Sequence, residues 1–229
     1  WGDGSSDTIT AYNQAEVTHT YAASGTYTIQ ITGTIRGWYF NNGGDKLKIL
    51  NISEWGDFNF TKESAFRGCT NLTSTATDTP VIDFSYMFFS CSSWNPPNIG
   101  SWDMSSVTKM NWMLFNNQAF NQPIGSWDTS SLTKIDYMLF ASSSFDQSLA
   151  NWDITSITGT ADMNVFMAGV TLSTANYDAT LIGWQAQSVG SGLSPNFGNS
   201  KYTGGGDAAA ARAALISSDG WTITDGGIA

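Results

Sequence analysis

A repeat of 25 residues in the middle of the chain constrains the fold more than any other feature. Residues 120–133 read FNQPIGSWDTSSLT, and residues 145–158 read FDQSLANWDITSIT. Three residue types recur at this period, in the sets Trp102, Trp127 and Trp152; Asp103, Asp128 and Asp153; Met113, Met138 and Met163. A period of roughly 20 to 50 residues is typical of stacked repeats, because one copy cannot bury its apolar side chains alone.

Looser copies upstream extend the repeated region. Residues 65–72 resemble residues 87–94 at a spacing of 22, so we expect about five stacked coils between residues 45 and 176. We expect a strand around residues 122–126 of each coil and a short helix or 3-10 turn near residues 132–139. The apolar positions expected in the core are Phe120, Ile124, Trp127, Leu132, Ile135, Met138 and Phe140, with their equivalents.

These features predict an α/β fold of one continuous unit. It is a leucine-rich-repeat-like right-handed solenoid with short strands and short helices or 3-10 turns. Residues 1–44 form an N-terminal β cap in which residues 26–31 alternate like a half-buried strand. Residues 45–176 form the coils. Residues 177–229 form a C-terminal cap with a loop, a helix over 208–216 after the capping residue Asp207, and a short strand over 221–224.

Charge and composition exclude several classes of function. Nine Lys and Arg stand against nineteen Asp and Glu, a net charge of −10. So acidic a chain is unsuited to nucleic acid or to anionic membrane surfaces. No apolar run reaches the roughly 18 residues of a transmembrane helix, so we expect no membrane insertion. The chain has one histidine, so a Ser-His-Asp or Cys-His catalytic site could be built only on that residue. Its two cysteines cannot form a four-thiolate zinc site. We therefore expect no enzymatic activity.

The repeats also carry a family resemblance. The run F-N-Q-x-I-x-x-W-D-x-S-S-V/L-T, followed by M-x-x-M-L-F, resembles the BspA-like family of leucine-rich-repeat bacterial surface proteins. The F-x-x-C-x-x-L pattern of residues 66–72 is similar to a variant of those repeats. Residues 177–184 and 220–226 resemble the C-terminal end of such domains. Residues 1–4, 19–21 and 25–28 resemble a polycystic-kidney-disease-type β-sandwich that is truncated at its start.

The resemblance implies a non-enzymatic bacterial cell-surface protein, extracellular and without a cofactor. It implies a monomeric module within a longer chain, of the kind found in adhesins. We expect it to bind a protein or peptide on host or neighbouring cells. Two alternatives stay open: a carbohydrate-binding module, whose partner is a surface glycan, and a structural spacer with no ligand.

An aromatic strip is the first candidate ligand site. Trp112 and Tyr137 occupy equivalent positions one repeat apart, so they are expected to stack side by side. Exposed rings of this kind can anchor a peptide or stack on a sugar. The alternative is that both rings belong to the amphipathic edge of the core.

A set of amide side chains is the second candidate. We expect Asn121, Gln122, Gln147 and Asn151 to project from one face of the coils, where paired donors and acceptors suit peptide backbone or sugar hydroxyls. The alternative is that these amides satisfy the protein's own backbone.

Three further residue sets have two interpretations each. The stacked carboxylates of Asp103, Asp128 and Asp153 either bond nearby backbone N–H groups or form a weak calcium site. Cys69 and Cys91, at matching repeat positions, either form a disulfide or are buried thiols. The single histidine, His19, is expected to be a structural, hydrogen-bonded residue.

Overall fold

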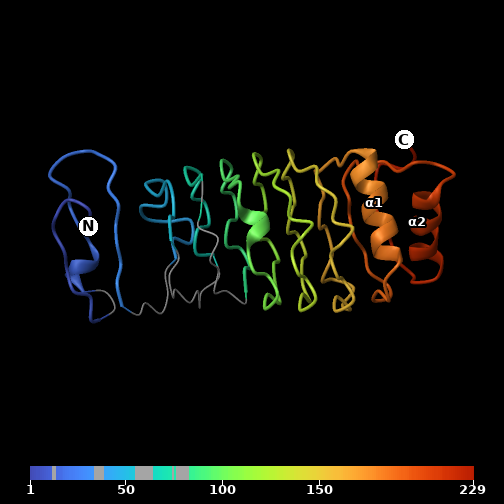
Figure 1. The fold of residues 1–229 in the computed structure, drawn as a ribbon, viewed down its shortest axis with the longest axis horizontal. Coiled ribbons are helices and arrows are strands. Elements are labelled where there is room, and N and C mark those ends of the chain that lie inside the picture. Colours follow the sequence, from blue (N-terminus) through green and yellow to red (C-terminus); the bar gives the residue numbers. More distant parts are fainter. Residues whose placement is uncertain (12–13, 34–38, 55–63, 74, 76–82) are drawn as a thin grey trace. The chain divides into compact units, whose positions relative to one another are not determined.

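The fold is described from a computed structural model that covers residues 1–11, 14–33, 39–54, 64–73, 75 and 83–229 (Figure 1). The chain divides into two compact units, residues 1–34 and 35–229. Residues 55–63, 74 and 76–82 of the expected coil region lie outside the described residues. The domain boundaries placed at residues 44 and 176 stay predictions.

The second unit contains two α-helices at its C-terminal end, α1 (Thr174–Gln185) and α2 (Asp207–Ser217). The described residues also form two 3-10 helices, η1 (Ala15–Val17) in the first unit and η2 (Ile99–Ser101) in the second. The described residues form isolated β-bridges but no sheet. The prediction of an α/β, leucine-rich-repeat-like right-handed solenoid is therefore wrong.

Irregular coils lie side by side in the second unit instead, and three equivalent segments join them. We call residues 83–91, 109–117 and 134–142 the ladder turns. In the second ladder turn, alternate backbone N–H groups donate to the next coil at 2.7–3.0 Å, from Met110, Trp112, Leu114 and Asn116 to the carbonyls of Lys134, Asp136, Met138 and Phe140. The N–H groups between them donate three residues back, to their own coil, at 3.2–3.3 Å: Met113, Phe115 and Asn117. The other ladder turns repeat this alternation.

The alternation explains why no strands form. In a strand paired on both sides, successive N–H groups point to opposite neighbours. Here every second N–H turns back into its own coil, which requires a bent backbone. Each ladder turn accordingly has two residues in the left-handed region, with φ between 56° and 60°: Tyr86 and Ser90, Trp112 and Asn116, Tyr137 and Ala141. These turns take the place of regular strands and helices in the coils.

Each predicted strand fails for a local reason. Residues 122–126 include the start of a turn, and amide side chains rather than a backbone ladder join them to neighbouring coils. Residues 26–31 make no backbone hydrogen bond with the rest of the described chain. Residues 221–224 form only one isolated bridge, from Thr224 to Asn196. Near residues 132–139, where a short helix or 3-10 turn is expected, the described residues form no helix. They do form turns, closed by hydrogen bonds three residues apart such as that from the Met138 N–H to the Ile135 carbonyl.

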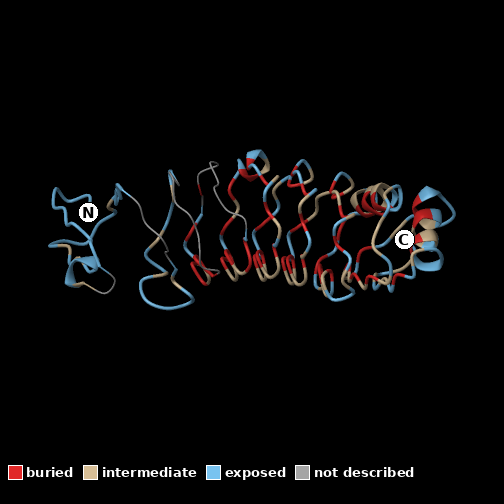
Figure 2. Cartoon of the chain, turned by 90° about the horizontal axis from the view of Figure 1, so that it is seen from below, coloured by how far each residue is buried: buried red, intermediate tan, exposed pale blue. Residues whose placement is uncertain are grey.

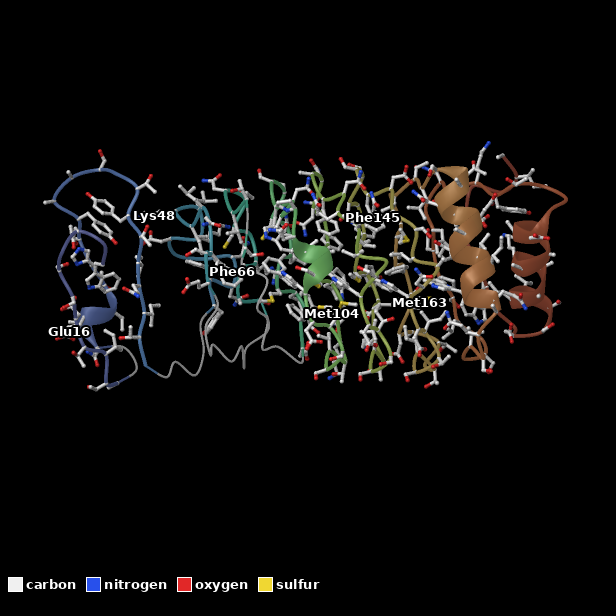
Figure 3. The ribbon with its side chains drawn as sticks, in the orientation of Figure 1. Glu16, Lys48, Phe66, Met104, Phe145 and Met163 are labelled. Atoms are coloured by element: carbon white, nitrogen blue, oxygen red, sulfur yellow. The ribbon has the colours of Figure 1, made fainter. Side chains whose placement is uncertain are left out.

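Figure 2 marks the buried residues of the stack, and most of them are apolar or aromatic. Phe66, Met104, Phe145 and Met163 are among the side chains that fill it (Figure 3). The predicted core residues are confirmed as buried, namely Phe120, Ile124, Trp127, Leu132, Ile135 and Met138. Phe140 is the exception, because its ring is only half-buried.

Two of the three repeated tryptophans connect successive coils through their indole N–H groups. Trp127 donates to the carbonyl of Ile99, and Trp152 donates to the carbonyl of Ile124, both at 2.9 Å. A buried indole N–H needs such a partner, because leaving it unpaired costs roughly 1–3 kcal/mol. Trp102 stands at the equivalent position without this bond, and its buried indole N–H has no hydrogen-bond partner among the described residues.

Helix α1 takes the place of a further coil at the end of the stack. Its Trp184 donates to the carbonyl of Leu149 at 2.8 Å, as Trp127 and Trp152 donate to preceding coils. Gly183 lies so close to Ala150 that a side chain at this position would collide with the Ala150 backbone. The sequence analysis missed α1, although Tyr177, Thr180, Leu181 and Trp184 are buried and follow the i, i+3, i+4, i+7 spacing of a helix face. The predicted helix over 208–216 is confirmed as α2, but the prediction that Asp207 caps it is wrong: Gly206 is the N-cap residue, and Asp207 is the first residue of the helix and makes no capping bond with its side chain.

The N-terminal unit has a small aromatic cluster and no strand among its described residues. Trp1 stacks on His19 with ring centroids 5.0 Å apart, and Tyr21 stacks on Tyr27 at 3.9 Å. The Nε2 atom of His19 lies 2.8 Å from the carboxylate of Asp3, which confirms a hydrogen-bonded histidine. Hydrogen bonds from Ser5, and one from His19, hold the pKa of Asp3 below its usual range.

A buried carboxylate ties the C-terminal segments together. Asp225, whose side chain is 3% exposed, accepts hydrogen bonds from Arg212 and from the hydroxyl of Tyr177, both at 2.7 Å. It also accepts from the backbone N–H of Gly227. This one carboxylate therefore joins α1, α2 and the last residues of the chain.

We predict that Asp225→Asn lowers the free energy of unfolding by about 3–5 kcal/mol, because it leaves the half-buried Arg212 guanidinium without its counter-charge. Urea unfolding followed by tryptophan fluorescence measures this change. Asp45→Asn is the matched control, because Asp45 is 71% exposed and its pairing with Lys48 contributes little. Equal losses in both variants would contradict the prediction.

Candidate functional site

Six half-buried aromatic side chains form one patch on the ladder turns. We call them the aromatic strip. Three belong to the first left-handed position of each ladder turn, Tyr86, Trp112 and Tyr137. The other three lie three residues later in each turn, Phe89, Phe115 and Phe140.

The rings stack in two columns that run from coil to coil. Trp112 stacks on Tyr86 at 5.7 Å and on Tyr137 at 4.0 Å, within 10° of parallel. The predicted stacking of Trp112 and Tyr137 is thus confirmed. In the second column, Phe115 stacks on Phe89 at 4.4 Å and on Phe140 at 4.6 Å. These spacings match the roughly 4.8 Å between hydrogen-bonded backbone segments, so the ladder itself sets the ring spacing.

Stacking determines which part of each ring is available to a ligand. The central rings, Trp112 and Phe115, have an aromatic neighbour on both faces. Arg67 lies over Phe89, with its guanidinium carbon 4.6 Å from the ring centroid. Both faces of the two central rings are covered, so a ligand that reaches either ring meets its edge. An aromatic edge carries partial positive charge, whereas the face is negative.

The strip ends where the next coil lacks rings. The coil of residues 162–169 bonds to the third ladder turn through the same backbone ladder. Val165 stands at the position of Tyr137 and has the same left-handed φ, 54°. Ala168 stands at the position of Phe140. The strip therefore spans three coils, with Arg67 at one end and small aliphatic side chains at the other.

A polar column runs beside the strip. The carboxylate of Asp136 belongs to this column and lies 3.6 Å from the ammonium of Lys134. Burial raises the pKa of Asp136, and Lys134 opposes that rise. One coil away, the Ser85 hydroxyl donates to the Asn111 side chain at 2.6 Å. Ser85, Asn111 and Asp136 occupy equivalent positions in the three ladder turns.

The predicted amide set lies in hydrogen bonds between coils. The Gln122 amide donates to the Asn95 side chain at 2.9 Å, and the Gln147 amide donates to the Asn121 side chain at 2.8 Å. The same Asn121 oxygen accepts from the backbone N–H of Asp146. Asn151 is exposed and apart from this ladder. These contacts correspond to the alternative in which the amide side chains hydrogen-bond to the protein itself. A ligand-binding role for the four residues stays a prediction.

The three stacked aspartates form local turns. Asp103, Asp128 and Asp153 each accept hydrogen bonds from the hydroxyl and the backbone N–H two residues later. The Ser105 and Ser130 bonds lower the pKa of Asp103 and Asp128. Among the described residues, no three His, Cys, Asp or Glu side chains gather where they could hold a metal ion. Calcium binding by these carboxylates stays an untested alternative.

Cys69 and Cys91 are both buried, and both are free thiols in the structure. The Cys91 thiol lies 3.0 Å from the carbonyl oxygen of Phe66. Burial raises the pKa of Cys69 to about 12 and also raises the pKa of Cys91. Of the two alternatives, the structure therefore contains two buried thiols and not a disulfide.

Comparison with known proteins identifies the repeats. The family model described as "Mycoplasma protein of unknown function, DUF285" matches residues 59–177, more than half of the chain. The chain belongs to this family. The match covers the ladder turns and fits a bacterial surface repeat protein; it does not confirm the more specific BspA-like resemblance. No curated protein and no solved structure matches the chain.

The helices of the described residues are all too short or too polar to cross a lipid bilayer.

Sequence reasoning found two of the six strip residues. Tyr86, Phe89, Phe115 and Phe140 were missed, although the blocks YMFF (86–89), WMLF (112–115) and YMLF (137–140) show both aromatic positions. Phe140 was predicted to lie in the core, because a periodic apolar residue is ordinarily expected to be buried. For this reason the column of Phe89, Phe115 and Phe140 was not predicted.

Left-handed backbone at Tyr137 gives a direct test of the ladder turn. We predict that Tyr137→Gly is more stable than Tyr137→Ala by about 1 kcal/mol, because only glycine adopts φ of 56° without steric cost. Both variants lose the same stacking, so the difference in urea midpoint isolates the backbone. At Phe140, which lacks positive φ, alanine should be the more stable of the two. If glycine and alanine had the same order of stability at Tyr137 and at Phe140, the ladder-turn geometry would be contradicted.

The buried thiols should be inert in the folded protein. We predict that Ellman's reagent at pH 8 labels neither Cys69 nor Cys91 until denaturant is added, and then labels both. The raised thiol pKa values and burial act in the same direction here. If no thiol appears in denaturant without a reductant, the two cysteines are bridged.

Proposed function

We propose that the chain is a non-enzymatic ligand-binding module of a bacterial cell-surface adhesin. We further propose that it binds a protein or peptide on host or neighbouring cells through the aromatic strip. The aromatic strip is the observation that supports this proposal most. The family match and the acidic, lysine-poor composition support a surface location.

The energetics of the strip support a role beyond packing. A bulky residue in the left-handed region costs about 1–2 kcal/mol, and three strip residues adopt it: Tyr86, Trp112 and Tyr137. Each stacked pair returns roughly 0.5–1.5 kcal/mol beyond burial, so stacking offsets the strain without a large surplus. All six aromatic side chains nevertheless remain partly exposed to solvent. Aromatic residues are the commonest anchors of protein interfaces.

The orientation of the rings favours a peptide over a sugar. Sugars bind aromatic side chains mainly through the ring face. In the strip, Trp112 and Phe115 have both faces covered, and Arg67 lies over Phe89. The exposed, positive ring edges suit carbonyl oxygens and the faces of partner aromatic side chains. The carbohydrate-binding alternative is therefore the weaker one for this surface.

A lack of enzymatic activity is part of the proposal. The single histidine is paired with Asp3 in the N-terminal unit. Asp103, Asp128 and Asp153 hold local turns, and Asp225 holds an arginine. The side chains most suited to proton transfer are thus engaged in structure. We expect no resident cofactor.

We predict that replacing the phenylalanine column removes binding without unfolding the protein. The variant Phe89→Leu, Phe115→Leu, Phe140→Leu keeps the positions apolar but removes three aromatic edges. Binding of fluorescently labelled protein to intact cells should fall by about tenfold or more, a loss of roughly 1.4 kcal/mol. Circular dichroism and urea unfolding check that the coils stay folded.

The matched control makes the same chemical change inside the core. Phe120 and Phe145 stack on each other at 5.9 Å and are fully buried. The variant Phe120→Leu, Phe145→Leu should lower stability and leave binding unchanged. If the control loses binding and the strip variant does not, the strip is not the ligand site.

Protease treatment of the cells distinguishes the alternatives. Loss of binding after surface proteins are removed supports a protein ligand. Binding that survives the treatment and is reproduced on a glycan array would replace the proposal with the carbohydrate-binding module. Absence of saturable binding to any cell would leave only the structural spacer.

A further inference from the structure

Residues 26–32 of the N-terminal unit have the composition of a paired β-strand. The segment reads TYTIQIT, in which Tyr27, Ile29 and Ile31 alternate with polar residues. β-Branched and aromatic residues dominate it, as in strands generally. The run has no proline, and residues 20–33 carry no charge. Charged residues and proline are the usual protection of an unpaired strand.

The structure leaves this segment without a backbone partner. No backbone hydrogen bond joins residues 26–32 to any other part of the described chain. Tyr27 packs within the unit by stacking on Tyr21 at 3.9 Å. Ile29 and Ile31, in contrast, are 48% and 56% exposed. Two large apolar side chains and a row of unpaired amides thus lie on one uncharged segment.

One edge of the segment is blocked and the other is open. Gly2 lies so close to Thr28 that a side chain at Gly2 would collide with the Thr28 backbone. In an extended chain, the N–H and C=O of one residue point to one edge, and those of the next residue point to the other. The Thr28 edge therefore faces Gly2, and the edge of Tyr27, Ile29 and Ile31 is free to pair.

We propose that residues 26–32 pair in antiparallel orientation with the same segment of a second copy of this chain, centred on Ile29. In this register Ile29 faces Ile29, Tyr27 faces Ile31, and the polar residues of both strands share the opposite face. No like charges meet, because the segment carries none. The pairing satisfies the free amides of both copies and gives a two-fold symmetric contact. It differs from the monomer expected from the sequence, and it does not depend on the aromatic strip.

Cysteine cross-linking of the 229-residue chain tests the register. In the proposed pairing, the two Ile29 Cα atoms lie about 5.5 Å apart, within the range of a disulfide. The Ile29→Cys variant should form a disulfide-linked dimer in oxidised glutathione. Gln30→Cys is the matched control, because residue 30 faces residue 28 and the two copies of residue 30 are about 7–8 Å apart. The protein without an added cysteine controls for Cys69 and Cys91, which are buried.

Sedimentation equilibrium measures the contact without a cross-link. Ile29→Lys should weaken dimerisation by about tenfold or more, because two lysines then face each other across the strands. Ile9→Lys changes an equally exposed isoleucine of the same unit, at 49%, and should leave the dimer unchanged. A chain that stays monomeric at high concentration would overturn the proposal. So would equal cross-linking of the Ile29→Cys and Gln30→Cys variants, or equal loss in both lysine variants.

Discussion

The alternating backbone hydrogen bonds of the ladder turns are the constraint on which the rest of the second unit depends. In each turn, four N–H groups bind carbonyls of the next coil and three bind carbonyls of their own coil. This arrangement satisfies the buried backbone without a sheet, which is what a stack of irregular coils requires. It also fixes the left-handed residues and the short spacing between equivalent side chains. The tryptophan bonds, the amide ladder and the stacked rings all use that spacing.

The candidate site follows from the same constraint. Rings placed at the coil spacing must stack face to face, so the ladder covers the faces of the central rings and leaves edges exposed. A flat aromatic platform, such as a sugar would need, is therefore difficult to build in the middle of this stack. Arg67 at one end and Ala168 at the other set the limits of the strip. The backbone spacing of the coils therefore determines which part of each central ring a ligand can reach.

The sequence predicted what depends on periodicity and missed what depends on backbone conformation. The repeat placed Phe120, Ile124 and Trp127 in the core and stacked Trp112 on Tyr137, because equivalent positions must meet in any stack. It could not distinguish strands from ladder turns, since both bury alternate apolar residues and repeat at one spacing. The positive φ of Trp112 and Tyr137 has no sequence signal, because glycine or asparagine is the expected residue there. Helix α1, in contrast, could have been predicted from the sequence, because its buried residues follow the spacing of one helix face.

The two left-handed positions of each ladder turn show that backbone preference alone does not explain the strip. The second position holds the residues Ser90, Asn116 and Ala141, and its equivalents in the flanking coils are Gly68 and Gly169. Small residues, glycine and asparagine are what left-handed backbone favours. The first position has nearly the same φ, yet it holds Tyr86, Trp112 and Tyr137. Its flanking equivalents are Ser64 and Val165, so the aromatic side chains are confined to the three coils of the strip. Since the backbone demands the same of both positions, the turn alone does not explain the rings at the first position, where stacking between neighbouring coils offsets the cost of the left-handed backbone.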